Sequence, residues 1–330
     1  MALAPANSEP VILFDQVDMT FPGGGGVFDL NYNVAPGTIL GVIGPSGCGK
    51  TTTVRLALGL YQPTKGNIRV FGRKPSSFHA TDRERIGYIP QQFVLYPTLS
   101  VSENAAFVAS LYGMSRGAIR KRLDELLPFV DLAEARHRRG SQLSGGMQRR
   151  LMLVSALMHG PDLLFADEPT AGIDPVLRAR FWDYFRSLRD QGHTLVVTTQ
   201  YVGEASYCDY VAVMRKGRIL QVDTPENLRR SVMGGEIIEI SFDASREYDA
   251  LRVLRRNPLV RYIRHIDIND DGNVILHITV ENAAEALPDL LKLLEDQEGP
   301  HIEVVSAARH EMSYDDIFIR IMEEQEKKDG

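Results

Sequence analysis

The segment from Gly44 to Thr51 constrains the fold of this chain more than any other part of its sequence. It reads GPSGCGKT: a glycine, four residues of any kind, a second glycine, a lysine and a threonine. The apolar residues 37–44 lead into it, and residues 51–60, which have helical spacing, follow it. A strand, a glycine-rich loop and a helix in this order are typical of a phosphate-binding loop, so the sequence predicts an α/β domain.

Each residue type in this loop has a physical role. The glycines let backbone N–H groups turn toward the phosphates, and the helix N-terminus adds partial positive charge. Lys50 is expected to reach the terminal phosphates of ATP, and the Thr51 hydroxyl can bind Mg²⁺. The predicted nucleotide contacts in the loop are Gly44, Pro45, Ser46, Gly47, Cys48, Gly49, Lys50, Thr51 and Thr52.

Composition narrows the class of protein. The 330 residues suffice for about two domains. There are 37 Lys and Arg against 43 Asp and Glu, a net charge of −6 that offers no overall basic footprint for nucleic acid. The residues MALAPANSEP do not resemble a leader peptide, and no long apolar stretch is present, so we expect a chain that is neither secreted nor membrane-spanning.

The two cysteines suggest no disulfide framework, and the eight histidines show no ligand spacing. We therefore expect no metal other than Mg²⁺ carried by the nucleotide. Cys48 lies beside Lys50 and near a helix N-terminus, surroundings that lower a thiol pKa. A reactive thiol and a silent small residue both remain open for this position.

An acidic pair ends the apolar stretch from Asp162 to Pro169. Asp167 is expected near a metal and Glu168 near an attacking water. Acidic pairs at strand ends are often only solvated turns, but together with the phosphate-binding loop this pair predicts a nucleotide hydrolase.

The segment Leu143 to Met147, LSGGM, opens another helical stretch. Ser144 can cap that helix, and Gly145 and Gly146 can let a ligand approach it, although a plain capping turn explains the same letters. LSGGM followed by an acidic strand resembles the signature motif of ATP-binding cassette (ABC) ATPases. Residues 167–175 are similar to the run from Walker B to the D-loop in that family, and the resemblance covers residues 10–230.

The resemblance implies further roles. Phe21 would stack on adenine, although it could instead be a core residue at a strand end. Gln91 would be the Q-loop glutamine, which senses Mg²⁺ and couples to a membrane partner, with the adjacent Gln92 leaving the register open. Asp174 would bridge the two active sites of a dimer. Gln200 stands where the family has its switch histidine.

That last departure affects the expected mechanism. A glutamine amide can hydrogen-bond a γ-phosphate, but it cannot exchange a proton near neutral pH. Glu168 is therefore the expected general base, with Gln200 positioning the reactants.

The resemblance implies a P-loop ABC ATPase domain over residues 10–230, with a helical subdomain over about 93–161. Residues 235–330 follow in the order strand, helix, two strands, helix, strand, which is that of a ferredoxin-like unit, and a closing helix. This C-terminal domain could bind a regulatory ligand or stabilise a dimer.

Two ATPase domains of this family pair head to tail, so Ser144, Gly145 and Gly146 of one copy would complete the site of the other. Met147, the residues TTQY and the segment from Met312 to Phe318 resemble the ATP-binding subunits of drug-resistance exporters. We therefore expect a homodimer on a separately encoded permease, peripheral on the inner, cytoplasmic face of the cell membrane. The alternative is a soluble cassette ATPase that acts on ribosomes or DNA.

Overall fold

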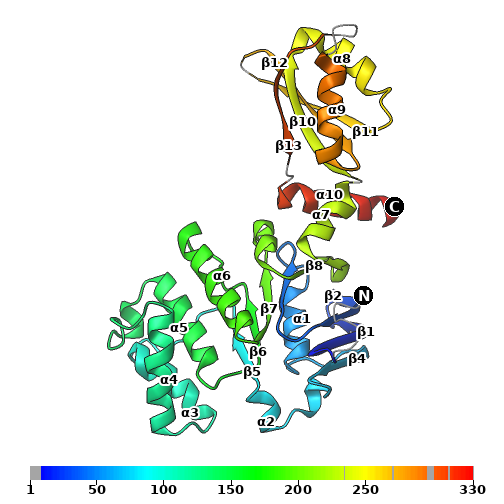
Figure 1. The fold of residues 1–330 in the computed structure, drawn as a ribbon. Helices are drawn as coiled ribbons and strands as arrows, with labels where there is room; N and C mark the ends of the chain where they lie inside the picture. The colour runs from blue at the N-terminus through cyan, green and yellow to red at the C-terminus, as the bar shows by residue number, and fades with distance from the viewer. Residues whose placement is uncertain (1–8, 234, 270, 296–300, 311–312, 330) are drawn as a thin grey trace. The chain divides into compact units, whose positions relative to one another are not determined.

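The structure, a computed structural model, describes residues 9–233, 235–269, 271–295, 301–310 and 313–329 (Figure 1). These residues divide between Pro225 and Glu226 into two units. Residues 1–8 and Met312, on which some of the expectations above rest, lie outside the described residues.

Parallel strands form the central sheet of the first unit, in the order β5-β6-β7-β3-β8-β9. Only β9 runs antiparallel to its neighbour. The apolar runs predicted as buried strands coincide with β3, β6 and β7, all of whose residues are buried. The bounds are β3 (Ile39–Ile43), β5 (Ile86–Ile89), β6 (Leu163–Asp167), β7 (Thr194–Thr199), β8 (Tyr210–Arg215) and β9 (Arg218–Asp223).

The strand order places three sequence motifs at one edge of this sheet. β7 lies between β6 and β3, and all three run in the same direction. The segments that follow their carboxyl ends therefore meet, although they are far apart in sequence. These segments are the acidic pair after β6, Gln200 after β7 and the glycine-rich loop after β3.

A second, antiparallel sheet has the order β2-β1-β4. Helix α1 (Lys50–Ala57) contacts both β4 and β6, so it lies between the two sheets (Figure 1). Val54 and Leu56 of α1 join a core cluster that takes residues from both sheets. The bounds are β1 (Ile12–Thr20), β2 (Gly26–Val34) and β4 (Lys65–Val70). Helix α6 (Pro175–Asp190) contacts β3 and β7 and buries Phe181, Trp182 and Phe185.

Helices dominate residues 93–161. Ser100 begins α3 with a capping box, in which its hydroxyl accepts from the backbone of Glu103 and the Glu103 carboxylate accepts from the Ser100 backbone. The Ser115 hydroxyl caps α4 by accepting from the Ala118 backbone. The remaining helices of the first unit are α2 (Ala80–Arg83), α3 (Val101–Leu111), α4 (Arg116–Phe129), α5 (Gly145–Leu157) and the short 3₁₀ turns η1 (Pro75–Ser77), η2 (Gly140–Gln142) and η3 (Val202–Tyr207).

The second unit contains four strands and two helices in the order strand, helix, two strands, helix, strand, followed by the helix α10. Its antiparallel sheet has the order β11-β12-β10-β13, and α8 and α9 cover one face of it. Ile238, Ile240 and Phe242 point to that face, while the alternate residues of β10 lie on the other. The bounds are α7 (Pro225–Met233), β10 (Glu236–Asp243), η4 (Ala244–Arg246), α8 (Glu247–Leu254), β11 (Val260–Ile268), β12 (Asn273–Val280), α9 (Ala283–Glu295), β13 (Val304–His310) and α10 (Tyr314–Asp329).

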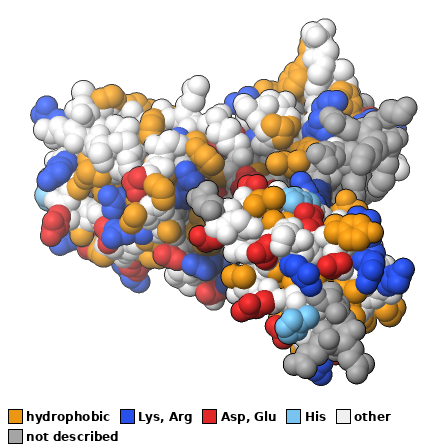
Figure 2. Space-filling model, turned by 90° about the horizontal axis from the view of Figure 1, so that it is seen from above, with side chains coloured by type: hydrophobic (Ala, Val, Ile, Leu, Met, Phe, Trp, Pro, Cys, Tyr) orange, Lys and Arg blue, Asp and Glu red, His pale blue; other side chains and the backbone are white. Residues whose placement is uncertain are grey.

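On the face seen in Figure 2, Lys and Arg side chains are interspersed with Asp and Glu, in keeping with the modest net charge. Within the described part of the chain, no helix combines the length and apolar composition needed to cross a bilayer.

Candidate functional site

The glycine-rich loop joins β3 to α1 as the sequence predicts. Gly49 precedes α1 with a φ of 112°, a left-handed conformation that glycine tolerates. A Cβ at Gly49 would also lie 2.7 Å from Val27 Cγ1 and 2.8 Å from Met214 Cε, so a side chain there would displace both. Pro45, Ser46 and Gly47 are exposed at the tip of the loop, where they are accessible to a ligand.

Lys50 is buried, and its ammonium group has three oxygen partners. Nζ donates to the carbonyl oxygens of Gly44 at 2.8 Å and Pro45 at 3.2 Å. It also lies 3.2 Å from Glu168 Oε1. The predicted phosphate-binding cation and the predicted general base are therefore direct neighbours.

Glu168 has a strained backbone, with a φ of 48° that residues bearing a side chain rarely adopt. Its backbone N–H donates to the carbonyl oxygen of Thr198 at 3.1 Å and to Thr198 Oγ1 at 3.0 Å. Strand β7 thus holds Glu168 in this conformation, which turns its carboxylate toward Lys50.

Asp167 has the surroundings of a metal ligand. Its Oδ1 accepts from Thr51 Oγ1 at 3.1 Å and from Thr198 Oγ1 at 2.6 Å. Its Oδ2 is buried without a hydrogen-bond partner among the described residues. A buried carboxylate oxygen without a partner is costly, and a bound cation would satisfy it. The Thr51 hydroxyl and the Asp167 carboxylate therefore fit Mg²⁺.

Gln91 contacts Glu168 across the site, and its Nε2 donates to Glu168 Oε2 at 3.0 Å. Of the two adjacent glutamines, Gln91 is therefore the one that reaches the acidic pair. Gln200 follows β7 and is exposed. Phe21 follows β1, is partly buried and packs edge-on against Tyr61, with ring centroids 5.7 Å apart.

Arg149 is a site residue that the sequence analysis missed. From α5 its guanidinium donates to the carbonyl oxygen of Gln91 at 2.9 Å and to that of Ala171 at 3.3 Å. Burial lowers its pKa, and the nearby Glu168 carboxylate acts in the opposite direction. Arg149 thus ties the signature helix to both the Q-loop and the acidic strand. The sequence signal that could have identified Arg149 is its position in the first turns of the helix that follows the signature motif.

Glu204 is a second missed residue. Its carboxylate is buried, accepts from Thr170 Oγ1 at 2.7 Å and lies 3.6 Å from Arg178 Nε. It anchors the segment after Glu168 to the turn that follows β7. No sequence pattern marked it.

Cys48 departs from the reactive-thiol hypothesis. The side chain is buried, and burial raises the pKa of its thiol more than the nearby Lys50 lowers it. Lys50 and the backbone N–H groups of the loop do lower this pKa, but the loss of water around the thiol has the larger effect. The alternative of a silent small residue agrees with the structure.

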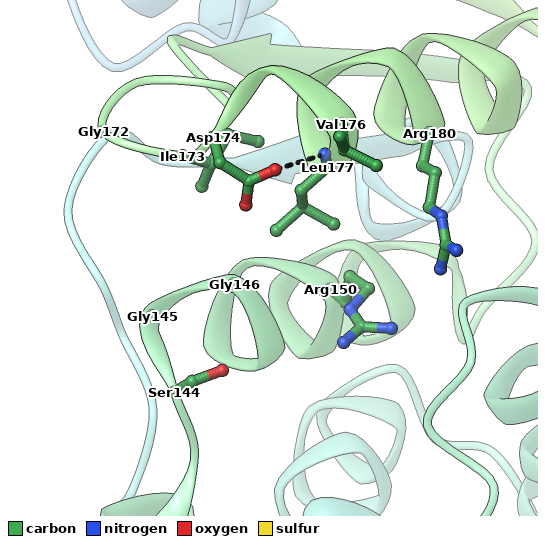
Figure 3. A pocket seen from close by; sticks show the side chains of 10 residues that line it. All are labelled: Ser144, Gly145, Gly146, Arg150, Gly172, Ile173, Asp174, Val176, Leu177 and Arg180. Carbon is green, nitrogen blue, oxygen red and sulfur yellow. Dashed lines mark hydrogen bonds between the residues drawn. The ribbon is translucent and has the colours of Figure 1, made fainter.

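The signature residues lie at a separate cavity of about 510 Å³ (Figure 3). Ser144 caps α5, its hydroxyl accepting from the Met147 backbone at 3.3 Å. Asp174 caps α6, its Oδ1 accepting from the Leu177 backbone at 2.9 Å. As far as the described residues go, the lining contains no residue of the phosphate-binding loop: it is Ser144, Gly145, Gly146, Arg150, Gly172, Ile173, Asp174, Val176, Leu177 and Arg180.

Comparison with known proteins agrees with this geometry. A family described as ABC transporter matches residues 27–171. Nod factor export ATP-binding protein I of Paraburkholderia xenovorans is 39% identical over 233 residues, which span 70% of this chain and 77% of that protein. Linearmycin resistance ATP-binding protein LnrL of Bacillus subtilis is 30% identical over 293 residues, 88% of this chain and 92% of that protein.

Among solved structures, an ATP-binding cassette in a post-hydrolysis state, bound to ADP and Pi, is 26% identical. The match covers 64% of this chain and 98% of that one, with a TM-score of 0.60. Sequence identity over most of these two ATP-binding proteins, together with this fold, confirms the predicted P-loop ABC ATPase. The chain belongs to the ABC transporter family, as an ATP-binding and ATP-hydrolysing subunit of the exporter type.

Proposed function

We propose that this chain powers the export of a drug-like or lipid-like compound through a separately encoded permease. It works as a head-to-tail homodimer on the inner, cytoplasmic face of the cell membrane. The names of its relatives, which refer to Nod factor export and linearmycin resistance, support the direction and the kind of cargo.

One observation carries the proposal: the phosphate-binding loop and the signature residues occupy different places on the same chain. Ser144, Gly145 and Gly146 line a cavity beside Asp174 to which the loop does not contribute. In this proposal each chain contributes one half-site to each of two nucleotides. A head-to-tail pair would bring the signature half-site of one copy to the phosphate-binding loop of the other.

Within each completed site the residues have distinct roles. Lys50 binds the terminal phosphates of ATP and exchanges its contact with Glu168 for them. Glu168 accepts the proton of the attacking water, and Gln200 positions the γ-phosphate by a hydrogen bond. Phe21 stacks on the adenine. The glycine-rich loop donates backbone N–H groups to the phosphates.

Mg²⁺ would be held by Thr51 and Asp167, with Gln91 as the third residue that senses it. When bound, it neutralises charge on the β- and γ-phosphates. The partnerless Oδ2 of Asp167 supports this assignment.

The helical subdomain is the proposed contact with the permease. Several large apolar side chains are exposed next to Gln91 and on α3: Phe93, Val94, Tyr96, Phe107 and Leu111. A cytoplasmic helix of a permease could cover them. Gln91 contacts Glu168, and Arg149 holds the Gln91 backbone. A movement of this apolar surface would therefore also move side chains that contact the acidic pair.

Copurification tests the proposal. The tagged Glu168→Gln chain, expressed in its native cell, is solubilised from membranes with mild detergent and ATP. A polytopic membrane protein in near-equal amount is the expected result. A matched chain that also carries Leu111→Glu should lose this protein while it still binds ATP. Ribosomal or DNA-repair components without a membrane protein would overturn the transporter assignment.

A further inference from the structure

Three side chains that can each bind a metal ion meet on the sheet of the C-terminal unit. Glu239 lies on β10, His277 on β12 and His310 on β13. Glu239 is directly opposite His277, and His310 is opposite Ile237, two residues along β10 from Glu239. All three lie on the face opposite the α8 and α9 core, because Ile238 and Ile240 point the other way.

The side chains converge at close range. His277 Nε2 lies 2.8 Å from Glu239 Oε2, and His310 Nδ1 lies 3.1 Å from the same oxygen. The two imidazole rings are 4.1 Å apart at their centroids. Each of the three residues offers one possible metal-ligand atom, and these three atoms all lie within 4.8 Å of one another.

Two imidazole nitrogens and one carboxylate oxygen form a recognised ligand set for Zn²⁺. Bond lengths near 2.0–2.2 Å place tetrahedral ligand atoms about 3.3–3.5 Å from each other. The observed separations of 2.8 and 3.1 Å would have to widen by roughly 0.2–0.7 Å to admit the ion. A fourth position would stay open for water.

The cluster also has access to solvent. His277 and His310 line a cavity of about 530 Å³. The side chains of His277, His310 and Glu239 are 14, 31 and 37% exposed. Arg264 and Arg320 also line the cavity, and Asp316 of α10 faces them from the same lining. The carboxylates of Glu239 and Asp316 thus offset the two guanidinium groups, and the local charge does not exclude a cation.

We propose that Glu239, His277 and His310 form a binding site for a divalent transition-metal ion, with Zn²⁺ as the best match. Neutral imidazole and carboxylate suit Zn²⁺, whereas Mg²⁺ and Ca²⁺ require oxygen ligands. A bound ion joins β10, β12 and β13 and lies at the cavity that α10 lines. The site belongs to the C-terminal unit and does not depend on the nucleotide chemistry described above.

The test is Zn²⁺ binding to the full chain, purified without a histidine tag. Affinity and stoichiometry are measured by competition with a chromophoric chelator, in excess Mg²⁺ and without nucleotide. The variants are His277→Ala, His310→Ala and the isosteric Glu239→Gln. His265→Ala is the matched control, because His265 forms a similar pair with Glu247, at 2.8 Å, outside the cluster.

The expected result is one equivalent of Zn²⁺ bound to the wild type and to His265→Ala. Each cluster variant should bind it at least ~10–100-fold more weakly, the loss that removal of an outer-shell partner alone causes. Zn²⁺ should also raise the unfolding temperature of the wild-type C-terminal unit, and not that of Glu239→Gln, which keeps the side-chain shape. Wild-type protein that binds no Zn²⁺, or cluster variants that bind it as the wild type does, would overturn the proposal.

Discussion

Lys50 Nζ lies 3.2 Å from Glu168 Oε1, and Lys50 is 4% exposed. The two residues are 118 positions apart and follow β3 and β6, which the strand order β6-β7-β3 places on either side of β7. The predicted phosphate-binding cation and the predicted general base therefore face each other within one site.

Replacement of that base should stop turnover without loss of the nucleotide. Glu168→Gln keeps the shape of the side chain but cannot accept a proton, so kcat should fall by ~10²–10⁴ while ATP still binds. Steady-state phosphate release and equilibrium ATP binding measure the two effects. The exposed Glu84→Gln, in the same unit, is the control and should hydrolyse ATP normally. Near wild-type turnover by Glu168→Gln would refute the assignment.

Removal of the buried metal-binding carboxylate should affect the cation more than the nucleotide. Asp167→Asn should weaken Mg²⁺ binding to the ATP complex by on the order of tenfold or more, because it removes the charge that a partnerless buried oxygen carries. Electron paramagnetic resonance of Mn²⁺ bound in place of Mg²⁺ gives the affinity. The exposed Asp289→Asn serves for comparison. Equal Mn²⁺ affinities in both variants would contradict the metal assignment.

A bulky residue in the signature half-site should block pairing. No atom lies within 4 Å of a Cβ at Gly145, so Gly145→Glu fits the free subunit. The new side chain would occupy the place proposed for the partner's nucleotide, so ATP-dependent dimerisation and hydrolysis should be lost. Gly117→Glu, at another open glycine near a helix N-terminus, should have little effect. Light scattering with ATP compares the variants, and an ATP-dependent Gly145→Glu dimer would count against the head-to-tail pairing.

Gln200 should contribute a hydrogen bond to catalysis but should add no ionisation to the pH dependence of the rate. Gln200→Ala should lower kcat by roughly tenfold, since a hydrogen bond to a charged group contributes ~1.5 kcal/mol. Gln200→His should add an inflection to the pH–rate profile near the ordinary histidine pKa of ~6.5. Profiles of the two variants and the wild type, recorded side by side, check both points. An unchanged rate in Gln200→Ala would remove this residue from the mechanism.

Cys48 should react slowly with alkylating reagents. Burial raises the pKa of its thiol, so below that pKa the thiolate fraction is small and grows about tenfold for each pH unit. Labelling of the folded chain should therefore be at least ~10-fold slower than that of the urea-unfolded chain and should accelerate as pH rises. Mass spectrometry of Cys48, with Cys48→Ser as the blank, measures the rate. Rapid labelling at neutral pH would restore the reactive-thiol hypothesis.

The sequence was most informative where a site is local in the chain. The loop from Gly44 to Thr51 is contiguous, and its spacing follows from what a phosphate needs, so its place between β3 and α1 could be predicted. The apolar runs at β6 and β7 predicted buried strands for the same reason, since continuous burial requires continuous apolar sequence.

Contacts that depend on packing could not be predicted. Arg149 reaches Gln91 across 58 positions, and no spacing rule connects them. The state of Cys48 depends on the burial of its side chain, which the letters around it do not reveal. His277 and His310 stand 33 positions apart, so a search for short ligand spacings passes over them, and only strand pairing brings them to Glu239.

The pairing of β10 with β12 runs through eight consecutive residue pairs without a bulge, and Glu239 opposite His277 is one of them. A slip of one residue would turn His277 into the apolar layer and Leu276 out to water. Correct alignment of the strands and assembly of the three-residue cluster are thus the same event. An ion that binds only the assembled cluster would stabilise the sheet in its correct register and would not stabilise misaligned registers.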